Sequence, residues 1–520
     1  MSGLFWNRLG LVLLGLALLA AGLGFRQYGI TWDEPLHVEY GRRALAWYAS
    51  LGQDRSLLDF QNLYLYGALY DVTAALAQTI SPLDDYGTRR LLGALAGLLG
   101  VVGAGRLAGD MAGPRAGTLA MALLLLTPDW WGHAFANPKD VPVGTAMVWA
   151  LVFGLRTIRT LPAPAAGTLV GLGASIGATL GIRIGAGIIV LPLLLGAALR
   201  VGTADNRARF TGTALLRLMP AVLLAWAIMV AAWPWAQLAP LSNPIRGLAE
   251  FSHFPLDFTF PLWGVPVRST NLPWWYVPAG FAAKLPEPVL VGLTATVMLA
   301  LFGLHRRKLP ADRAALAAAI LLPPLIVVAT GAVLYDGIRH LLFLLPPLAA
   351  AAALGLDALL ARLSLRWAAA MLAALALWTG LQTAILVRLH PYETIWFNSL
   401  VGGPRGAEGR FELDGWGSAL TEAARTLTAT VRAQEGDAAL THPYRVRVCG
   451  PSGSALTYLP AAWRAPADGK GPADFFLSFT RSRCGDEPEG PVLVRIERDG
   501  VLLAFVKDLR SLPDDPAIGH

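Results

Sequence analysis

Apolar runs close to 20 residues long recur along the chain as far as residue 387, separated by short polar stretches. As an α-helix, a run of this length crosses the roughly 30 Å hydrocarbon core of a bilayer. The pattern therefore predicts an all-α membrane domain of about eleven spans. We place them at about 9–25, 91–107, 116–128, 141–155, 166–182, 184–199, 218–235, 286–304, 314–334, 341–358 and 367–387.

Two moderately apolar segments near the N-terminus are not counted as spans. Residues 36–51 and 63–80 mix apolar side chains with charges such as Arg42 and Asp71. If 63–80 crossed the bilayer, every later loop would change sides. We therefore predict a first outer loop over 26–90, in which both segments form amphipathic helices in the plane of the interface.

Arginine and lysine concentrate in alternate loops. With the N-terminus inside, the inside loops hold Arg106, Arg115, Arg156, Arg159, Arg200, Arg207, Arg209, Arg217, Arg306, Arg307, Lys308, Arg313, Arg362 and Arg366. The short outside loops hold few cations, namely Lys139, Arg183 and Arg339. This asymmetry follows the positive-inside rule. It also places the Pro- and aromatic-rich segment 236–283 outside, either as a cover for a lipid-substrate groove or as an interfacial cap.

The character of the chain changes after residue 387. Residues 388–520 are polar, with a helical pattern at 415–433 and an alternating, strand-like run at 492–496. We therefore predict two domains, a membrane domain over 1–387 and a small α/β domain over 388–520 on the outside. The chain's two cysteines, Cys449 and Cys484, lie in the second domain, and the sequence leaves open whether they form a disulfide.

Composition supports the membrane assignment. Of 520 residues, 55% are hydrophobic and 15% are charged, with a mean hydropathy of +0.51, whereas soluble domains average about 25% charged residues. A net charge of +7 would suggest nucleic acid in a soluble protein, but here the basic residues sit between apolar spans. The absence of a Walker loop from the sequence speaks against ATP-driven transport, and no Cys/His cluster has zinc spacing.

The pair Asp33-Glu34 lies just beyond the first span. Asp33 suits the N-cap of a helix whose first turn contains Pro35. Such a cap would hold a carboxylate in place at the membrane surface, where it is suited to deprotonate an acceptor hydroxyl as a general base. The candidate catalytic residues are Asp33, Glu34 and Asp140.

Cations recur at outside span junctions, beside further acidic residues. Each one alone is explained as an interfacial anchor. Together they suggest a phosphate site, because arginine binds phosphate bidentately and lysine binds it as a point charge. The candidates for this site are Lys139, Arg183, Lys284, Arg339 and His340, with Asp140 supporting the base or orienting the substrate. Asp33, Glu34, His37, Asp140 and His340 could together bind a divalent cation, but nothing in their spacing requires one, and the sequence leaves a metal cofactor open.

With these residues placed, the chain resembles the GT-C superfamily of membrane glycosyltransferases. It is closest to the family 39 type, which includes protein O-mannosyltransferases and the lipid A aminoarabinose transferase. The resemblance covers roughly residues 1–400. It rests on Asp33-Glu34 with the in-plane helices after it, Lys139-Asp140, Arg339-His340 before Leu344-Leu345-Pro346, and the junction of residues 391–398 and 401–403.

The resemblance implies transfer of a sugar from a polyprenyl-phosphate donor, with inversion, to a lipid, glycan or protein acceptor. The reaction would take place at the periplasmic face of a bacterial inner membrane. Asp33 would be the base, Asp140 the second acid, and Lys139, Arg183 or Arg339 would contact the donor phosphate. Because the leaving group is already a phosphate, one base suffices, without the general acid that glycosidases use. The polar tail does not resemble that of the O-mannosyltransferases, so the acceptor stays open.

Three other interpretations compete. A transporter or flippase for a lipid-linked or anionic substrate would also have many spans, but it predicts inverted repeats and broken helices near mid-bilayer. A ligase or polymerase would use the same donors with a glycan acceptor, and a scaffold would use the outer domain to bind a partner. The sequence leaves the sugar and the oligomeric state open.

Overall fold

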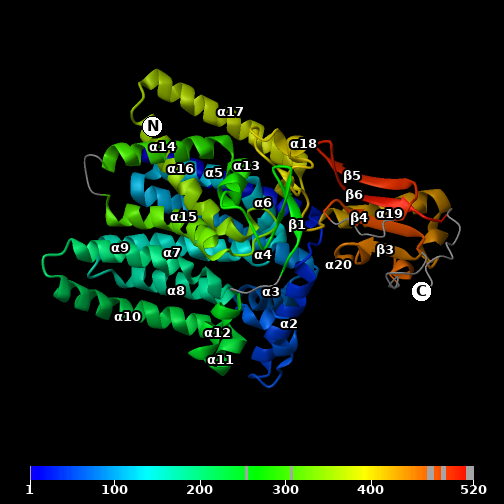
Figure 1. Cartoon of the computed structure of the whole chain (residues 1–520), viewed down its shortest axis with the longest axis horizontal. Coiled ribbons are helices and arrows are strands. Elements are labelled where there is room, and N and C mark those ends of the chain that lie inside the picture. The colour runs from blue at the N-terminus through cyan, green and yellow to red at the C-terminus, as the bar shows by residue number, and fades with distance from the viewer. Residues whose placement is uncertain (1, 252–255, 305–308, 465–472, 482–487, 511–520) are drawn as a thin grey trace.

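The computed structural model describes residues 2–251, 256–304, 309–464, 473–481 and 488–510. A bundle of long helices carries a smaller α/β domain at one end (Figure 1). This arrangement confirms the predicted fold class of a helical membrane domain followed by a small C-terminal domain.

Within the described ranges, eight helices are long and apolar enough to cross a membrane. They are α1 (Gly3–Gly24), α4 (Asp85–Ala112), α7 (Asp140–Thr160), α9 (Val190–Gly202), α10 (Arg207–Ala231), α15 (Ala311–Thr330), α16 (Leu345–Leu360) and α17 (Leu365–Leu389). Short 3-10 turns extend three of them: η1 (Phe25–Gln27) follows α1, η4 (Ile184–Ile189) precedes α9, and η5 (Arg339–Leu344) precedes α16. The chain is therefore a multi-pass membrane protein.

Three further apolar helices are shorter, namely α5 (Pro114–Leu125), α8 (Ala166–Ile182) and α14 (Glu287–Leu304). Each of the eleven predicted spans thus coincides with an apolar helix. The 12 residues of α5 extend only about 18 Å at 1.5 Å per residue, so this helix is too short to cross the hydrocarbon core by itself.

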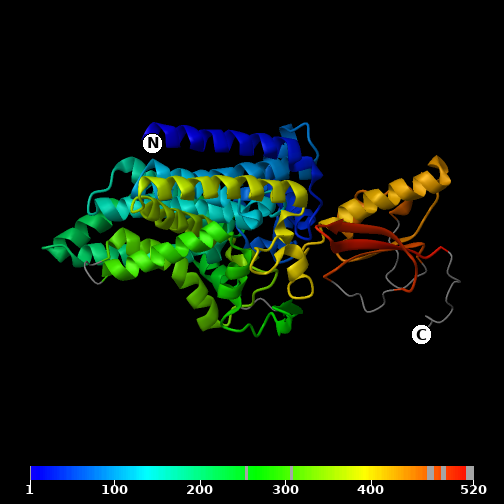
Figure 2. The same cartoon turned by 90° about the horizontal axis from the view of Figure 1, so that it is seen from above.

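The outer helices of the bundle expose apolar side chains. Leu11 of α1, Leu216 of α10 and Leu365 of α17 are 69%, 77% and 88% exposed, and these helices lie at the periphery (Figures 1 and 2). Leucine side chains exposed in this way are unfavourable in water, but they are compatible with contact to the hydrocarbon of a bilayer. At the centre, α4 and α7 are mostly buried.

Ion pairs join the helices at the end away from the C-terminal domain. Arg156 pairs with Asp110 at 2.5 Å, Arg159 with Asp312 at 2.7 Å, and Arg115 with Asp357 at 2.5 Å. These three arginines belong to the predicted inside loops, so the structure gathers them at one end. The predicted inside cations Arg306, Arg307 and Lys308 lie outside the described residues.

The predicted first outer loop contains α2 (Glu34–Ala49) and α3 (Leu69–Ile80), with the short turns η2 (Ser56–Asp59) and η3 (Leu63–Leu65) between them. Both predicted amphipathic helices are present, and they run across the direction of the bundle helices (Figure 1). The second helix begins later than predicted, at Leu69, because the chain first turns through η3.

The predicted outer loop 236–283 is largely structured. It contains α12 (Ser242–Phe251), the antiparallel hairpin of β1 (Thr259–Leu262) and β2 (Val265–Arg268), and α13 (Tyr276–Lys284), after α11 (Pro234–Leu238). Leu262 forms an isolated bridge with Phe411 of the C-terminal domain. The loop therefore contacts that domain as well as the bundle. Its Phe254 lies outside the described residues.

The C-terminal domain is built on a four-stranded sheet in the order β3-β4-β6-β5. Its strands are β3 (Val446–Cys449), β4 (Phe475–Phe479), β5 (Val492–Arg498) and β6 (Val501–Asp508), with only β3 and β4 parallel among these neighbours. The helix α19 (Ala419–Glu435) packs its apolar face on the sheet. Shorter helical pieces are η6 (Glu393–Ile395), α18 (Gly403–Ala407), η7 (Asp437–Leu440), α20 (Ser452–Leu456) and η8 (Ala461–Trp463).

Two local predictions for this domain are confirmed. The helix predicted at 415–433 is α19, and the strand predicted at 492–496 is β5. Cys449 is disulfide-bonded, and Cys484 lies outside the described residues.

Candidate active site

Asp33 occupies the N-cap position of α2, but its side chain caps nothing. Its Oδ2 instead accepts a hydrogen bond from Lys139 Nζ at 2.9 Å and another from Arg339 Nη1 at 3.3 Å. The expected backbone position is therefore correct, while the carboxylate is held by two cations from distant segments.

The second oxygen of Asp33 is left open. Both cations bind Oδ2, and among the described residues no hydrogen bond or ion pair reaches Oδ1. Burial by itself would raise the pKa of Asp33, but the charges of Lys139 and Arg339 outweigh it and hold the pKa well below its usual range. Asp33 is thus ionised at every physiological pH and offers one free acceptor oxygen.

Glu34 points away from this cluster. Its Oε2 accepts hydrogen bonds from the backbone N–H and hydroxyl of Thr31 at 2.7 and 3.1 Å, and its Oε1 lies 3.8 Å from Arg90 Nε. The side chain is buried, and this burial raises its pKa despite the charge of Arg90. Glu34 therefore stabilises the turn that presents Asp33 and does not face Lys139 or Arg339.

Glu34→Gln is expected to lower stability more than it lowers any chemistry at Asp33. The amide retains the size of the side chain, but its NH2 group must face either the donors of Thr31 or the guanidinium of Arg90, at a cost of about 1–3 kcal/mol. We expect a lower apparent Tm in thermal unfolding of the purified protein. The control is Glu39→Gln on the same helix, whose side chain is 39% exposed. Equal apparent Tm values for the two variants would contradict the stabilising role.

Asp140 begins α7 with both of its oxygens engaged. Oδ2 accepts from Asn137 Nδ2 at 2.9 Å, and Oδ1 accepts from Arg183 Nη1, also at 2.9 Å. Asn137 in turn accepts the backbone N–H groups of Lys139 and Asp140. The predicted second acid therefore orients Arg183 and the turn that carries Lys139.

A cavity of about 400 Å³ is lined by Asp140 and by the two cations that hold Asp33, while Asp33 itself is not among the residues that line it. Four predicted phosphate-binding residues line it, namely Lys139, Arg183, Arg339 and His340. The Nη2 atom of Arg339 lies 3.3 Å from His340 Nε2. Other walls are apolar and come from η4, α15 and η5, including Ile188, Val327 and Phe343. A cavity that combines cations with apolar walls suits an amphiphilic anion.

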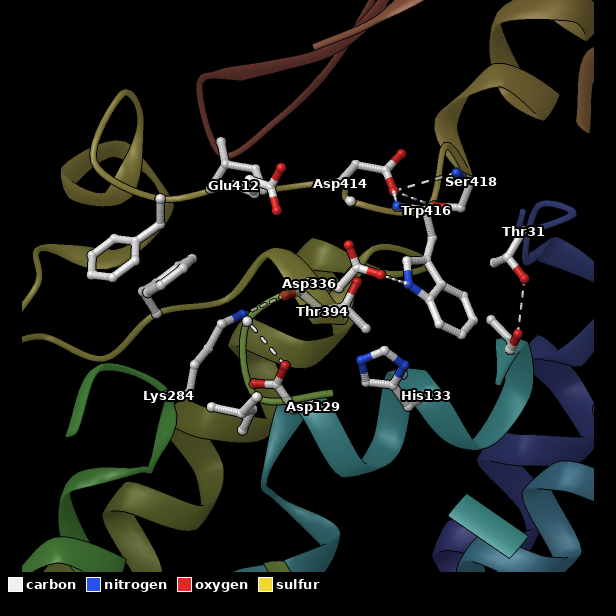
Figure 3. A pocket seen from close by; sticks show the side chains of 18 of the residues that line it. Thr31, Asp129, His133, Lys284, Asp336, Thr394, Glu412, Asp414, Trp416 and Ser418 are labelled. Atoms are coloured by element: carbon white, nitrogen blue, oxygen red, sulfur yellow. Dashed lines mark hydrogen bonds and ion pairs between the residues drawn. The ribbon is translucent and has the colours of Figure 1, made fainter. Parts of the chain in front are cut away.

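Lys284 does not join this cluster. It lines a second cavity of about 90 Å³, together with Asp129, His133 and Trp416 (Figure 3). Its Nζ donates to the Thr394 carbonyl at 2.6 Å and lies 3.4 Å from Asp129 Oδ1. Burial lowers the pKa of Lys284 and raises that of Asp129 to about 6. The structure thus separates Lys284 from the other predicted phosphate-binding residues, because Lys284 lies at the end of α13, within hydrogen-bond distance of the Thr394 carbonyl.

Nothing in the described ranges gathers three or more His, Cys, Asp or Glu side chains as a metal site. The acidic side chains considered for a divalent cation diverge: Glu34 turns to Thr31 and Asp140 to Arg183. His37 pairs instead with Asp71, at 2.9 Å between Nδ1 and Oδ2.

The structure adds residues that the sequence did not single out for the site. Asp336 pairs with Arg339 at 3.3 Å, and Trp416 donates its indole N–H to Asp336 at 3.0 Å. Arg481, from the C-terminal domain, reaches Asp336 at 2.6 Å. The sequence feature that points to this turn is the Asp-Gly pair at residues 336–337, shortly before Arg339. In the structure, Asp336 and Gly337 have φ of 57° and 62°.

Glu412, on the second cavity, predicts a pH dependence of stability. Burial, against the charge of Arg481, raises its pKa from 4.5 to about 7. The folded state then binds a proton more tightly than the unfolded chain, so this contribution to stability is complete below pH 4.5 and is lost as the pH rises through 7. We expect the apparent Tm to fall from about pH 5 to pH 8, and Glu412→Gln to flatten that slope.

The matched control is Glu497→Gln, whose side chain is 44% exposed. It should leave the slope unchanged. An unaltered slope in Glu412→Gln would show that Glu412 does not titrate in this range.

No protein-family model and no curated protein matches the chain. Among solved structures, it is similar to ArnT from Cupriavidus metallidurans bound to undecaprenyl phosphate, at 15% identity and a TM-score of 0.49, with 97% of each chain covered. It is also similar to the archaeal oligosaccharyltransferase AglB from Archaeoglobus fulgidus in complex with an inhibitory peptide and a dolichol-phosphate. That likeness has 13% identity and a TM-score of 0.48, and it covers 90% of this chain and 69% of that chain.

Both of these proteins belong to the GT-C superfamily, and ArnT is the lipid A aminoarabinose transferase. At these identities and TM-scores, no substrate and no residue role carries over to this chain.

Proposed function

We propose that this protein is an inner-membrane glycosyltransferase that moves a hexose or pentose from a polyprenyl-phosphate donor to an acceptor hydroxyl on the periplasmic side. The observation that carries the proposal is the state of Asp33. One carboxylate oxygen is held by Lys139 and Arg339, and the other is open. These cations also line a cavity with apolar walls, which suits a lipid phosphate.

The donor is bound through its phosphate and its lipid. Lys139 and Arg183 contact the phosphate oxygens, since Lys acts as a point charge and Arg as a bidentate donor. The first isoprenoid units lie along the apolar side chains of Ile188, Val327 and Phe343. Asp140 holds Arg183 in place for this contact.

The transfer is a single displacement. Oδ1 of Asp33 accepts the proton of the acceptor hydroxyl while that oxygen attacks the anomeric carbon. The bond between the anomeric carbon and the phosphate oxygen breaks, and its electron pair leaves with the polyprenyl phosphate. Lys139, Arg183 and Arg339 stabilise the charge that develops on the phosphate. The anomeric centre is inverted, and no second carboxylate is needed as an acid.

Donor binding also activates the base. Without the donor, Lys139 and Arg339 depress the pKa of Asp33. A bound phosphate shares these cations, so the carboxylate is stabilised less and becomes a stronger base. Proton transfer is thereby favoured when the donor is in place.

The experiment uses the purified protein reconstituted in lipid vesicles with radiolabelled polyprenyl-phosphate hexoses and pentoses. Envelope lipids, glycans and proteins from the same cells serve as acceptors. We expect label to pass to one acceptor fraction while polyprenyl phosphate is released in equal amount. Movement of intact donor between leaflets without that release would instead support a flippase.

A further inference from the structure

A row of alternating charges leads from the C-terminal domain into the proposed active site. Glu412 Oε1 lies 3.2 Å from Arg481 Nε, and Arg481 Nη2 lies 2.6 Å from Asp336 Oδ1. Asp336 Oδ2 lies 3.3 Å from Arg339 Nε, and Arg339 Nη1 lies 3.3 Å from Asp33 Oδ2. All five side chains are at most 21% exposed, so solvent screens these pairs less than surface pairs.

Trp416 reinforces the same row. Its ring centroid lies 4.6 Å from the guanidinium carbon of Arg339, and its indole N–H donates to Asp336 Oδ2 at 3.0 Å. Its backbone carbonyl accepts the N–H of Trp32 at 3.1 Å, directly before Asp33. One residue of the C-terminal domain thus contacts both segments that supply Asp33 and Arg339. Figure 3 shows Asp336, Glu412 and Trp416 around the second cavity.

Arg481 has a distinct place in this arrangement. Arg339 and Trp416 hold Oδ2 of Asp336, while Arg481 holds Oδ1. The two arginines are ion-paired with Asp336 without hydrogen-bond geometry, and the hydrogen bond to the carboxylate comes from Trp416. Asp336 therefore lies between two positive charges, and the charge of Arg481 helps to keep it beside Arg339. Arg481 is 15% exposed and also donates to the carbonyl of Gly415.

We propose that Arg481 is a positioning residue of the active site, which holds Asp336 so that Asp336 orients Arg339 toward Asp33. The C-terminal domain then completes the site instead of serving only as a separate acceptor-binding module. The catalytic consequence rests on the proposed function, whereas the positioning itself rests on the contacts alone. The competing explanation is an ion pair that merely attaches the domain.

The first test needs no activity. We compare hydrogen exchange by mass spectrometry in the full-length wild type, Arg481→Met and Arg481→Lys. The control is Arg495→Met, whose arginine is 58% exposed and pairs with Glu497 on its own strand. Arg481→Met retains the packing of the stem, but it removes the charge opposite Asp336.

We expect amide exchange in peptides covering residues 30–34 and 335–341 to become about tenfold faster in Arg481→Met, as local opening becomes easier. Arg481→Lys should stay close to wild type, because an ammonium also pairs with Asp336, and the control should not change. Unaltered exchange in both peptides of Arg481→Met would overturn the proposal. Faster exchange throughout the C-terminal domain, but not in these peptides, would overturn it too, in favour of a purely structural pair.

The second test is a double-mutant cycle on sugar transfer. Arg481→Met should lower kcat/KM about tenfold in the wild-type background. It should lower kcat/KM less than about twofold in Arg339→Lys, because the guanidinium that it positions is already gone. Equal losses in both backgrounds would show that Arg481 does not act through Arg339. If the wild type neither transfers sugar nor binds polyprenyl phosphate, the proposed function fails, and the exchange experiment still decides the positioning.

Discussion

Asp33→Asn is expected to lower sugar transfer by about 10²- to 10⁴-fold, the contribution of a positioned general base. The amide has nearly the shape of the carboxylate but does not take the proton of the acceptor hydroxyl. Binding of polyprenyl phosphate should become tighter, since Lys139 and Arg339 no longer share their charge with a carboxylate. Transfer is followed with the radiolabelled donor, and binding with unlabelled polyprenyl phosphate.

The control for this variant is Asp59→Asn, an exposed aspartate of the same predicted outer loop. It should transfer sugar at the wild-type rate. Transfer by Asp33→Asn within a few-fold of wild type, in a protein with normal membrane insertion, would remove Asp33 as the base. Loss of donor binding in this variant would instead assign the carboxylate to donor recognition.

Arg339→Met is expected to damage both stability and transfer. The buried guanidinium pairs with Asp33 and with Asp336, so its removal leaves two acidic side chains without that partner. Breaking a buried pair in this way costs about 3–5 kcal/mol. Loss of a group that stabilises the leaving phosphate should lower kcat by about 10²- to 10³-fold. Thermal unfolding and the transfer assay measure the two effects separately.

Arg388→Met is the matched control, because Arg388 is 59% exposed and pairs with Asp499 at the protein surface. It should leave transfer unchanged. Compared with Arg339→Met, Arg339→Lys should have a higher apparent Tm, because the ammonium retains the positive charge. Its rate of sugar transfer should recover less, since an ammonium does not reproduce the planar guanidinium. A folded Arg339→Met variant with wild-type kcat would contradict the proposed role of Arg339 on the phosphate.

Sequence patterns predicted the helices well, because a run of about 20 apolar residues is recognisable as a membrane-spanning helix without any knowledge of its tertiary contacts. Each of the eleven predicted spans coincides with a helix, although α5 is short. α2, α19 and β5 lie close to their predicted positions, and α3 begins six residues later than predicted. The pair Asp33-Glu34 stood out because two adjacent acids lie just beyond an apolar span. The sequence did not show which of the two acids faces Lys139 and Arg339 and which one stabilises the turn, since both are carboxylates at adjacent positions.

The partners of the acids depended on the fold. Asp33 and Arg339 are 306 residues apart, and their contact follows from how the turn before η5 packs beside the turn before α2. Lys284 carries the same charge as Lys139, yet α13 places it opposite Asp129 in another cavity. The sequence predicted one phosphate site for both lysines, but the structure places Lys284 in a different cavity from Lys139.

By itself, the sequence determined a multi-pass helical domain, a small α/β domain after it, and a set of acids and cations at the ends of helices. Local patterns suffice for these features, because burial in lipid and helix periodicity act over short stretches of chain. Only the tertiary structure decided that Asp33 retains one open oxygen, that Glu34 supports the turn, and that Arg481 reaches Asp336. The contacts of Asp33 join segments far apart in the chain, since Lys139 and Arg339 are 106 and 306 residues away. Tertiary packing alone brings such segments within a few ångströms.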